Sequence, residues 1–463
     1  MVAPPTPRCP VSLPGLPVGA ACVVTGQQVG VLTGPLLTLL KAARAISFAR
    51  EQTAERGAPV VPLFWAASDD HDLDEIHHTF VVNGQDEVQR LRLELGPDRG
   101  AASEVVVPIE AGRALVAELF TLAAIDPAAF PLEPWLPQPG DTLASWFIRC
   151  FRQLFGAHAP AVIEPRELTA AARPLFDQAL RDDGAIGRAL AEGAAANAAA
   201  GLAAPLPVED EPPLFVIERG ARTRVRRGAR PGEFLVGERT ISRAALLDLA
   251  GPGLPRLSAN VALRTIVQAG CLPALAYVAG PTELLYYRQL EPLHRLFGVP
   301  FPQLVRRPHA TLLTTAAARA ARKLGLAPDR LLAALAAREA GPPARSPLLE
   351  RGAALRHEVA GYVEQLLALS PAVKSAADRR ATQLLQSFDG LLERAASAVA
   401  DGEQSETARW KTLAATLRPR GKPQDRSLNG LPFLAQRGPA LIEALLELRG
   451  EPDQHGVVPH PVL

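Results

Sequence analysis

The segment 21–65 constrains the fold more than any other part of the sequence. It begins with the apolar run ACVVT, which is rich in β-forming residues, and continues into the glycine-rich stretch GQQVGVLTG. Pro35 then occupies the favoured first position of a helix, LLTLLKAARAISFAREQ, and the apolar run APVVPLFW follows. A strand, a loop, a helix and a second strand of these lengths predict a parallel α/β unit, because parallel strands need a crossover connection.

A similar pattern recurs at 271–305, where CLPALAYV and VPFPQLV are predicted strands on either side of the helix TELLYYRQLEPLHRLF. The weaker run AVIE at 161–164 predicts one more strand. Segments 84–158 and 170–255 lack this regularity, although the second contains the strand-like runs LFVIE and EFLVG. We therefore expect residues 1–310 to form a Rossmann-like parallel sheet core, with these two segments as insertions.

From residue 311 to residue 418 the pattern becomes helical. Apolar residues spaced by four and three form two series, separated by Ser370-Pro371, which predict an α-helical coiled-coil domain built as an antiparallel hairpin. An ordinary helical bundle explains the same spacing. The series are Leu355, Val359, Tyr362, Leu366 and Leu369, and then Ala381, Leu384, Phe388, Leu391, Ala395 and Ala398. Residues 419–463 are expected to return to the core.

Composition narrows the class of protein. The formal net charge is +1, so no overall field attracts the chain to nucleic acid or to a membrane. No stretch approaches the roughly 20 apolar residues that span a bilayer, and the proline-rich N-terminus does not resemble a signal peptide. The four cysteines (Cys9, Cys22, Cys150 and Cys271) are scattered, which is typical of a cytoplasmic protein without disulfides or a zinc site.

The glycine-rich loop is the first candidate site. A loop between a parallel strand and a helix presents backbone N–H groups and the positive end of the helix dipole, an arrangement that favours phosphate. The alternative is a tight strand–helix turn, since no standard nucleotide fingerprint is matched. The candidate nucleotide- and phosphate-binding residues are Thr25, Gly26, Gln27, Gln28, Gly30, Gly34 and Lys41.

An acidic cluster with three of the nine histidines directly follows the strand that ends at Trp65. Carboxylates beside a histidine orient its ring and raise its pKa, which suits general acid–base catalysis. The same residue types also suit a divalent metal, and a solvated turn that caps a helix is the third interpretation. The candidate catalytic residues are Asp70, His71, Asp72, Asp74 and His78.

A third segment combines SANVALR and a following glutamine with the strand and helix of YVAGPTELLY. Its polar side chains are predicted to meet at one edge of a crevice; alternatively, the tyrosines belong to the core and Glu283 complements a helix dipole. The candidate substrate-binding residues here are Asn260, Arg264, Gln268, Tyr277, Gly280, Glu283 and Tyr286.

The fourth segment, KPQDRSLN, lies in a predicted loop near the C-terminus. A mobile basic loop that closes on phosphate is one interpretation, and a surface turn that anchors the C-terminus is the other. Lys422 is its candidate phosphate ligand, and Gln424, Arg426 and Asn429 are candidate substrate ligands.

These four segments, in this order, resemble the family of bacillithiol biosynthesis cysteine-adding enzymes (BshC). The resemblance rests on TGQQVG…GPLLTLLKA, FWAASDDHDLDEIHHT, SANVALR…LPALAYVAGPTELLYY and LRPRGKPQDRSLNGLPFL, and it extends from residue 23 to about 440. This chain departs from the family pattern at Ala259, Thr265 and Ala269, and it has Asp425 where the family has glutamate.

The resemblance implies a Rossmann-like core with inserted segments, a coiled coil, and a homodimer formed through the coiled coil. It also implies a ligase that joins cysteine to the amine of glucosaminyl-malate. By analogy with class I synthetases, ATP or another adenine nucleotide would activate the cysteine carboxylate. On this hypothesis the glutamine loop holds phosphate, His71 acts as acid or base, and Arg264 receives a carboxylate of the acceptor; no metal is expected.

Two other functions are consistent with the residues alone. A metal-dependent hydrolase or phosphoesterase would use the Asp/His cluster at 69–78. A non-catalytic assembly protein would sense a nucleotide through the core and assemble through the coiled coil.

Overall fold

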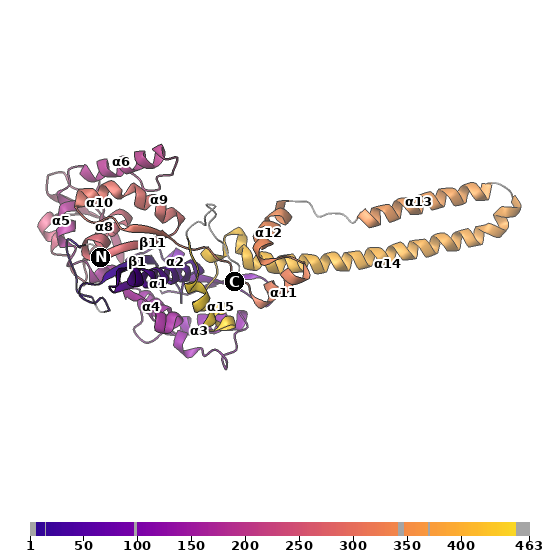
Figure 1. Cartoon of the computed structure of the whole chain (residues 1–463), viewed down its shortest axis with the longest axis horizontal. Helices are drawn as coiled ribbons and strands as arrows, with labels where there is room; N and C mark the ends of the chain where they lie inside the picture. Colours follow the sequence, from indigo (N-terminus) through magenta and orange to yellow (C-terminus); the bar gives the residue numbers. More distant parts are fainter. Residues whose placement is uncertain (1–5, 14, 97–99, 341–346, 369–370, 451–463) are drawn as a thin grey trace. The chain divides into compact units, whose positions relative to one another are not determined.

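The computed structural model describes residues 6–13, 15–96, 100–340, 347–368 and 371–450. The chain divides into two compact units, which are considered separately. Residues 1–312 and 419–463 form the core unit, and residues 313–418 form a helical unit (Figure 1).

The core unit is built on a five-stranded sheet in which all neighbouring strands are parallel. Helix α1 (Leu36–Arg56) connects the first two strands, and helices α9 (Pro281–Gln289) and α10 (Glu291–Phe297) connect the last two. The predicted α/β fold class is confirmed. In sheet order the strands are β12 (Gln303–Arg306), β11 (Ala274–Ala279), β1 (Ala21–Gln28), β2 (Val60–Ala67) and β5 (Ala161–Ile163).

Alternating side chains of β1 explain how both faces of the sheet are covered, because successive residues of a strand point to opposite faces. Val23 packs with Phe48 of α1 on one face. Cys22 and Val24 pack into the other apolar cluster, which includes Leu263 of helix α8 (Val261–Cys271). The central strands are therefore buried on both sides, as parallel strands usually are.

The two inserted segments have structures of their own. The first contains β4 (Val88–Arg92), α3 (Ile109–Leu122) and α4 (Leu143–Phe155), and it is preceded by α2 (Leu73–Ile76) and by β3 (His78–Val82), which pairs with β4. The second contains α5 (Arg173–Arg181), α6 (Ala185–Ala199) and α7 (Arg243–Leu247), together with an antiparallel sheet. That sheet has the order β10 (Arg256–Ala259), β6 (Leu214–Glu218), β7 (Ala221–Arg227), β8 (Glu233–Val236) and β9 (Arg239–Ser242).

Three boundaries differ from those expected from the sequence. Strand β1 continues to Gln28 instead of ending before the glycine-rich stretch, because it pairs with β2 as far as Ala67. The helix expected after β11 is divided into α9 and α10 near Pro292, whose ring nitrogen cannot donate a helical hydrogen bond. Pro35 immediately precedes the first helical residue of α1.

The helical unit contains α11 (Thr315–Lys323), α12 (Leu331–Ala340), α13 (Pro347–Ala368) and α14 (Pro371–Leu417). Arg356 of α13 binds Asp389 of α14 through two nitrogens, at 2.8 and 2.9 Å. Gly352, which precedes Arg356 in α13, lies against Leu392, which follows Asp389 in α14. The two helices therefore run antiparallel, as predicted. Leu369 and the side chains of Ala381, Ala395 and Ala398, which belong to the predicted apolar series, lie outside the described residues.

The C-terminal residues of the core unit form α15 (Leu431–Arg437) and α16 (Ala440–Leu446). Both contribute side chains to the apolar cluster around α1 and α4. Within the described part of the chain, we find no helix with the length and apolar character needed to cross a membrane.

One close contact between helices gives a test of the fold. A Cβ atom at Gly193 of α6 would lie 1.8 Å from the carbonyl oxygen of Gln289 at the end of α9. We expect Gly193→Ala to lower the free energy of unfolding by about 1–3 kcal/mol, because α6 must move away. Ala195→Ser, which adds one heavy atom on the exposed face of α6, is the control. Equal urea midpoints for the two variants would contradict this packing.

Candidate functional site

Two adjoining cavities lie at the carboxyl edge of the parallel sheet, where ligands of open α/β sheets usually bind. We call the one of about 410 Å³ the polar cavity and the one of about 190 Å³ the small cavity. Gln27 and Gln28, at the end of β1, line the polar cavity. Ala67, Asp70 and Arg264 line both cavities, so the two meet at these residues.

The polar cavity carries more positive than negative charge. Its lining has four basic and two acidic side chains, a difference of +2 over one set of residues. The start of α9, with Pro281 and Thr282, also lines it, and a helix N-terminus favours anions. Since Lys41 and Arg307 are paired with Glu283 and Asp425, Arg264 and Arg426 are the cations that suit a negatively charged ligand. The charged lining residues are Lys41, Arg264, Arg307, Arg426, Asp70 and Glu283.

A buried ion pair joins two strand–helix connections beneath this cavity. Lys41 of α1 is 1% exposed, and its Nζ lies 2.6 Å from Oε2 of Glu283 on α9. Nζ also donates to the carbonyl oxygen of Gly26 and, at 3.5 Å, to Oε1 of Gln27. Because its donors have protein partners, Lys41 holds the β1 and β11 connections together and orients Gln27.

Burial and ion pairing act in opposite directions on the pKa values of both side chains. Burial lowers the pKa of Lys41, although Glu283 opposes that change. Burial alone would raise the pKa of Glu283, but the charge and hydrogen bond of Lys41 outweigh it and the pKa is lowered. An ion pair this deeply buried is costly to break, because the remaining charge would lack a partner.

Glu283 also accepts hydrogen bonds from the hydroxyl groups of two residues that the sequence predicted to bind substrate. Its Oε1 accepts from Tyr277 at 3.0 Å and from Tyr286 at 3.3 Å, and its Oε2 accepts from the N–H of Gly280 at 2.7 Å. Arg264 donates from Nη2 to the Tyr286 hydroxyl at 3.1 Å. Tyr277 and Tyr286 thus lie behind the cavity wall and position the charged groups that form it.

The C-terminal segment packs into the core through buried polar contacts. Arg307, which follows β12, binds Asp425 at 2.6 Å. Burial alone would raise the pKa of Asp425, but His309 and Arg307 outweigh it and hold the pKa at about 2. Gln424 exchanges two hydrogen bonds of 2.8 Å with the backbone of Leu312. The segment thus serves as an anchor and brings Arg426 to the polar cavity.

The acidic cluster separates into residues that face the cavities and residues that do not. Asp70 lines both cavities and accepts a hydrogen bond from Gln28. Asp69 lines the small cavity and forms a 2.9 Å ion pair with the buried Arg256. His71 and Asp72 are exposed and line neither cavity.

The remaining residues of the cluster point elsewhere. The Asp74 side chain is 80% exposed. His77 is buried, and its Nδ1 contacts the carbonyl oxygen of Leu73. His78 packs edge-on against Phe80, and burial together with Arg90 lowers its pKa. Within the described residues, no group of three or more His, Cys, Asp or Glu side chains is arranged to hold a metal ion.

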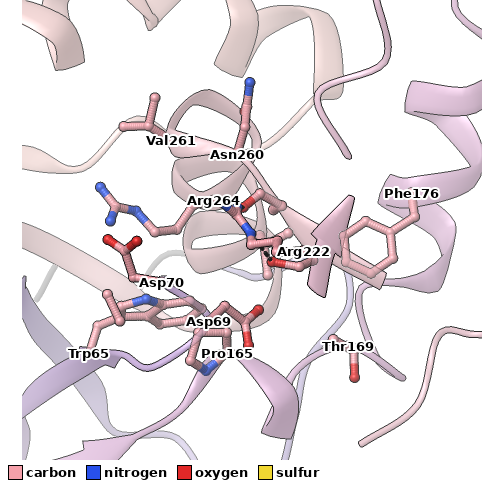
Figure 2. Close-up of a pocket in the computed structure, with 14 residues that line it drawn as sticks. Trp65, Asp69, Asp70, Pro165, Thr169, Phe176, Arg222, Asn260, Val261 and Arg264 are labelled. Atoms are coloured by element: carbon pink, nitrogen blue, oxygen red, sulfur yellow. Dashed lines mark hydrogen bonds between the residues drawn. The ribbon is translucent and has the colours of Figure 1, made fainter. Parts of the chain in front are cut away.

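The small cavity combines charged and apolar walls. Arg222 reaches it from β7 of the antiparallel sheet, and Trp65 and Phe176 reach it from β2 and α5. Figure 2 shows Arg264 and Asp70 on one side of this cavity and Phe176 on the other. Asn260 also lines it, and its Oδ1 caps α8 by accepting from two backbone N–H groups, at 2.9 and 3.0 Å.

The cavities bring together part of the set of residues proposed from the sequence. Those that line one or both are Gly26, Gln27, Gln28, Lys41, Asp70, Asn260, Arg264, Gly280, Glu283 and Arg426. Those that line neither are Thr25, Gly30, Gly34, His71, Asp72, Asp74, His78, Gln268, Tyr277, Tyr286, Lys422, Gln424 and Asn429.

Several of the residues outside the cavities have structural partners. The Thr25 hydroxyl donates to the carbonyl oxygen of Val278 at 2.9 Å and so joins β1 to β11. Gly34 adopts a φ of +64°, which favours glycine in the turn before α1. Gln268 accepts from Tyr287 at 3.2 Å, and Asn429 donates to Thr79 at 3.0 Å.

Comparison with known proteins agrees with this architecture. Residues 17–308 match the model of the N-terminal Rossmann-like domain of bacillithiol biosynthesis BshC, and residues 350–459 match that of its C-terminal coiled-coil domain. A relative from Koribacter versatilis, named "Putative cysteine ligase BshC", is 30% identical over 98% of this chain and 86% of its own length. The chain belongs to the BshC family.

Other BshC relatives are similarly distant. Proteins of the same name from Shouchella clausii and Symbiobacterium thermophilum are each 30% identical over 92% of this chain, and over 82% and 81% of their own lengths. A solved arginyl-tRNA synthetase from Thermus thermophilus is 15% identical with a TM-score of 0.21, a likeness too weak to carry an argument.

Sequence reasoning missed several residues of the BshC cavities. Trp65 ends one predicted strand and Arg307 lies two residues after the end of another, so their position at the sheet edge was a usable signal. Arg222 and Phe176 lie in the second insertion, and nothing in their local sequence indicates that they fold back onto the sheet.

The contribution of the buried Lys41–Glu283 ion pair to the stability of this BshC chain can be measured. Lys41→Met should lower the free energy of unfolding by roughly 3–5 kcal/mol, because Glu283 would be buried without its partner. Adding Glu283→Gln should recover a large part of that loss, as urea unfolding would measure. Lys323→Met, at an exposed lysine, should stay within about 0.5 kcal/mol of the wild type. Additive losses in the double variant would contradict the pairing.

Proposed function

We propose that this chain is a ligase that joins the carboxyl group of cysteine to the amine of glucosaminyl-malate, in the cytoplasm. The family of the chain and the names of its relatives support the reaction class. The observation that carries the proposal furthest is the pair of cavities that meet at Asp70 and Arg264. A ligase needs such an arrangement, because an activated carboxyl group and an amine must approach each other with water excluded.

The polar cavity is the proposed site of the phosphate-bearing cosubstrate, ATP or another adenine nucleotide. Its surplus of cationic side chains and the start of α9 suit the charge of such a ligand. Arg426 would bind phosphate oxygens, and the amide groups of Gln27 and Gln28 would add neutral hydrogen bonds; Arg307, which is paired with Asp425, would hold the segment that carries Arg426. When bound, the nucleotide supplies the energy that turns a carboxylate oxygen into a leaving group.

Lys41 has a different proposed role from direct phosphate binding. Its ammonium group already contacts Glu283, Gly26 and Gln27. We therefore propose that Lys41 fixes the positions of Gln27 and of the start of α9 around the ligand. Lys422 is exposed and lines neither cavity. We therefore assign to Arg426 the phosphate-binding role that the sequence suggested for Lys422.

We propose that Asp70 accepts the proton of the attacking amine of glucosaminyl-malate. An amine attacks only as the neutral base, and the proton that it loses needs an acceptor. Asp70 lies where the two cavities meet, and Gln28 and the backbone N–H of Asp72 hold its carboxylate in place. It would accept the proton that the acceptor amine loses as the amide bond forms.

The activity test compares two aspartates close in sequence. Purified protein incubated with cysteine, glucosaminyl-malate and ATP should yield the cysteinyl amide, detected by its mass. Asp70→Asn should reduce kcat by about 10²–10⁴-fold, the usual contribution of a general acid or base. Asp72→Asn and His71→Ala, which alter exposed side chains, should retain kcat within about twofold. Product formation that depends on His71 and not on Asp70 would overturn this assignment, and a folded protein that yields no product with any nucleotide would overturn the function.

We also propose a homodimer formed through the helical unit. Several apolar side chains of α13 and α14 face solvent, including Tyr362 at 63%, Leu384 at 54% and Leu391 at 59% exposure. They belong to the predicted four–three series, so they form a stripe of the kind that coiled coils bury between helices. A second copy of the same hairpin presents the same stripe and would cover it.

Light scattering during size-exclusion chromatography tests this assembly. The wild type should elute with the mass of two chains, and the variant with both Leu384→Glu and Leu391→Glu should elute with the mass of one, because charges are costly in an apolar interface. A variant with the exposed Arg394→Glu should stay dimeric. A monomeric wild type at micromolar concentration would contradict the proposal.

A further inference from the structure

The small cavity is lined by two arginines without a direct carboxylate partner among the described residues. Arg222 donates from Nε to the Ser258 hydroxyl at 3.3 Å and from Nη2 to the carbonyl oxygen of Ala259 at 2.9 Å. Arg264 donates to the Tyr286 hydroxyl. Among the described residues, neither arginine forms an ion pair with an acidic side chain. Two partly buried cations that contact no carboxylate directly favour binding of an anion between them.

The surroundings of the partly buried Arg222 differ from those of two fully buried arginines in the core. Arg256 and Arg307 both have carboxylate partners, at 2.9 Å from Asp69 and at 2.6 Å from Asp425. The guanidinium group of Arg222 instead lies 4.0 Å from the centre of the Phe215 ring. Burial lowers the pKa of Arg222, and the more distant charges of Asp69 and Asp70 only partly offset that.

The same cavity offers a counterpart for a positive charge. Asp70 lines it, and its partner in the core is the neutral amide of Gln28. Asp69 also lines it but is neutralised by Arg256. The cavity therefore presents both a cationic site and an anionic site, which is the complement of a zwitterion.

The remaining walls are apolar. Trp65, Phe176 and Val267 line the cavity, and Figure 2 shows Phe176 on the side away from Arg264 and Asp70. A zwitterion bound at Arg264 and Asp70 would thus direct its side chain toward an apolar surface. A small, weakly polar side chain such as a thiol suits that surface better than a charged one.

The volume of the small cavity distinguishes between the two organic substrates, cysteine and glucosaminyl-malate. The small cavity measures about 190 Å³, below the range of roughly 300–1,000 Å³ for pockets that enclose drug-sized ligands. An amino acid fits this space, whereas a hexose joined to a four-carbon dicarboxylate is far larger. The position of the charged side also agrees with the chemistry, because Arg264 and Asp70 border the polar cavity, where the carboxyl group would meet the cosubstrate.

We propose that the small cavity is the binding site for the amino-acid substrate, with Arg222 and Arg264 binding the α-carboxylate, Asp70 binding the α-ammonium group, and Trp65 and Phe176 enclosing the thiol side chain. This inference rests on the proposed ligase function for the identity of the amino acid. It assigns Arg264 to cysteine, and not to the malyl carboxylates of the acceptor.

Calorimetric titration of L-cysteine into the full-length protein tests this assignment without requiring turnover. Arg222→Met should weaken cysteine binding at least about tenfold, the effect of losing a hydrogen bond between charged groups. ATP binding, titrated separately, should change less than about twofold. Arg226→Met, at an exposed arginine of the same strand, is the matched control and should leave both affinities unchanged.

Ligand analogues provide a second measurement, on the wild type, that does not depend on the folding of a variant. Cysteamine lacks the carboxylate and 3-mercaptopropionate lacks the ammonium group, so each should bind at least about tenfold more weakly than cysteine. Equal binding of all three would overturn the zwitterion site. Loss of ATP binding in Arg222→Met, with cysteine binding intact, would instead assign the small cavity to the nucleotide.

The outcomes also distinguish this inference from the ligase proposal. If the wild type forms the cysteinyl amide but Arg222→Met binds cysteine normally, the ligase proposal stands and the small cavity is not the cysteine site. If cysteine binding depends on Arg222 but no amide forms with any nucleotide, the amino-acid site stands and the ligase proposal fails.

Discussion

The geometry of the candidate site depends on the buried ion pair between Lys41 and Glu283. One partner lies on the helix after β1 and the other in the first turn of the helix after β11, so the pair ties two neighbouring crossover connections together. The same carboxylate orders Tyr277 and Tyr286, and Tyr286 in turn holds Arg264. Arg264 borders both cavities. A single charge pair thus links the polar cavity to the small cavity.

Contacts that are distant in sequence complete the site around this pair. The C-terminal segment contributes Arg426 because Asp425 is fixed to Arg307 at the end of β12. The second insertion contributes Arg222 because its antiparallel sheet folds back onto the carboxyl edge of the parallel sheet. The parallel sheet provides the rigid platform, and these two later parts of the chain supply cationic side chains.

Much of the fold could be predicted from the sequence, because the strand–helix–strand pattern and the four–three helical spacing are local signals. Gln27, Gln28 and Glu283 were also predictable, since residues at the carboxyl ends of parallel strands meet at one edge of a sheet. His71 shows the limit of that rule. It lies between Asp70 and Asp72, two residues before α2 begins at Leu73. In this short turn His71 is exposed, whereas Asp70 faces the cavities. Arg222 was not predictable, because its position depends on tertiary folding of an insertion.

The most direct test of this account is a crystal structure of the protein with L-cysteine and a non-hydrolysable ATP analogue. We expect phosphate groups in the polar cavity, in contact with Arg426, and the amino acid beside Arg222 and Asp70 with its carboxyl group directed toward the phosphates. Both ligands bound away from the carboxyl edge of the parallel sheet, with the Lys41–Glu283 pair undisturbed, would contradict it.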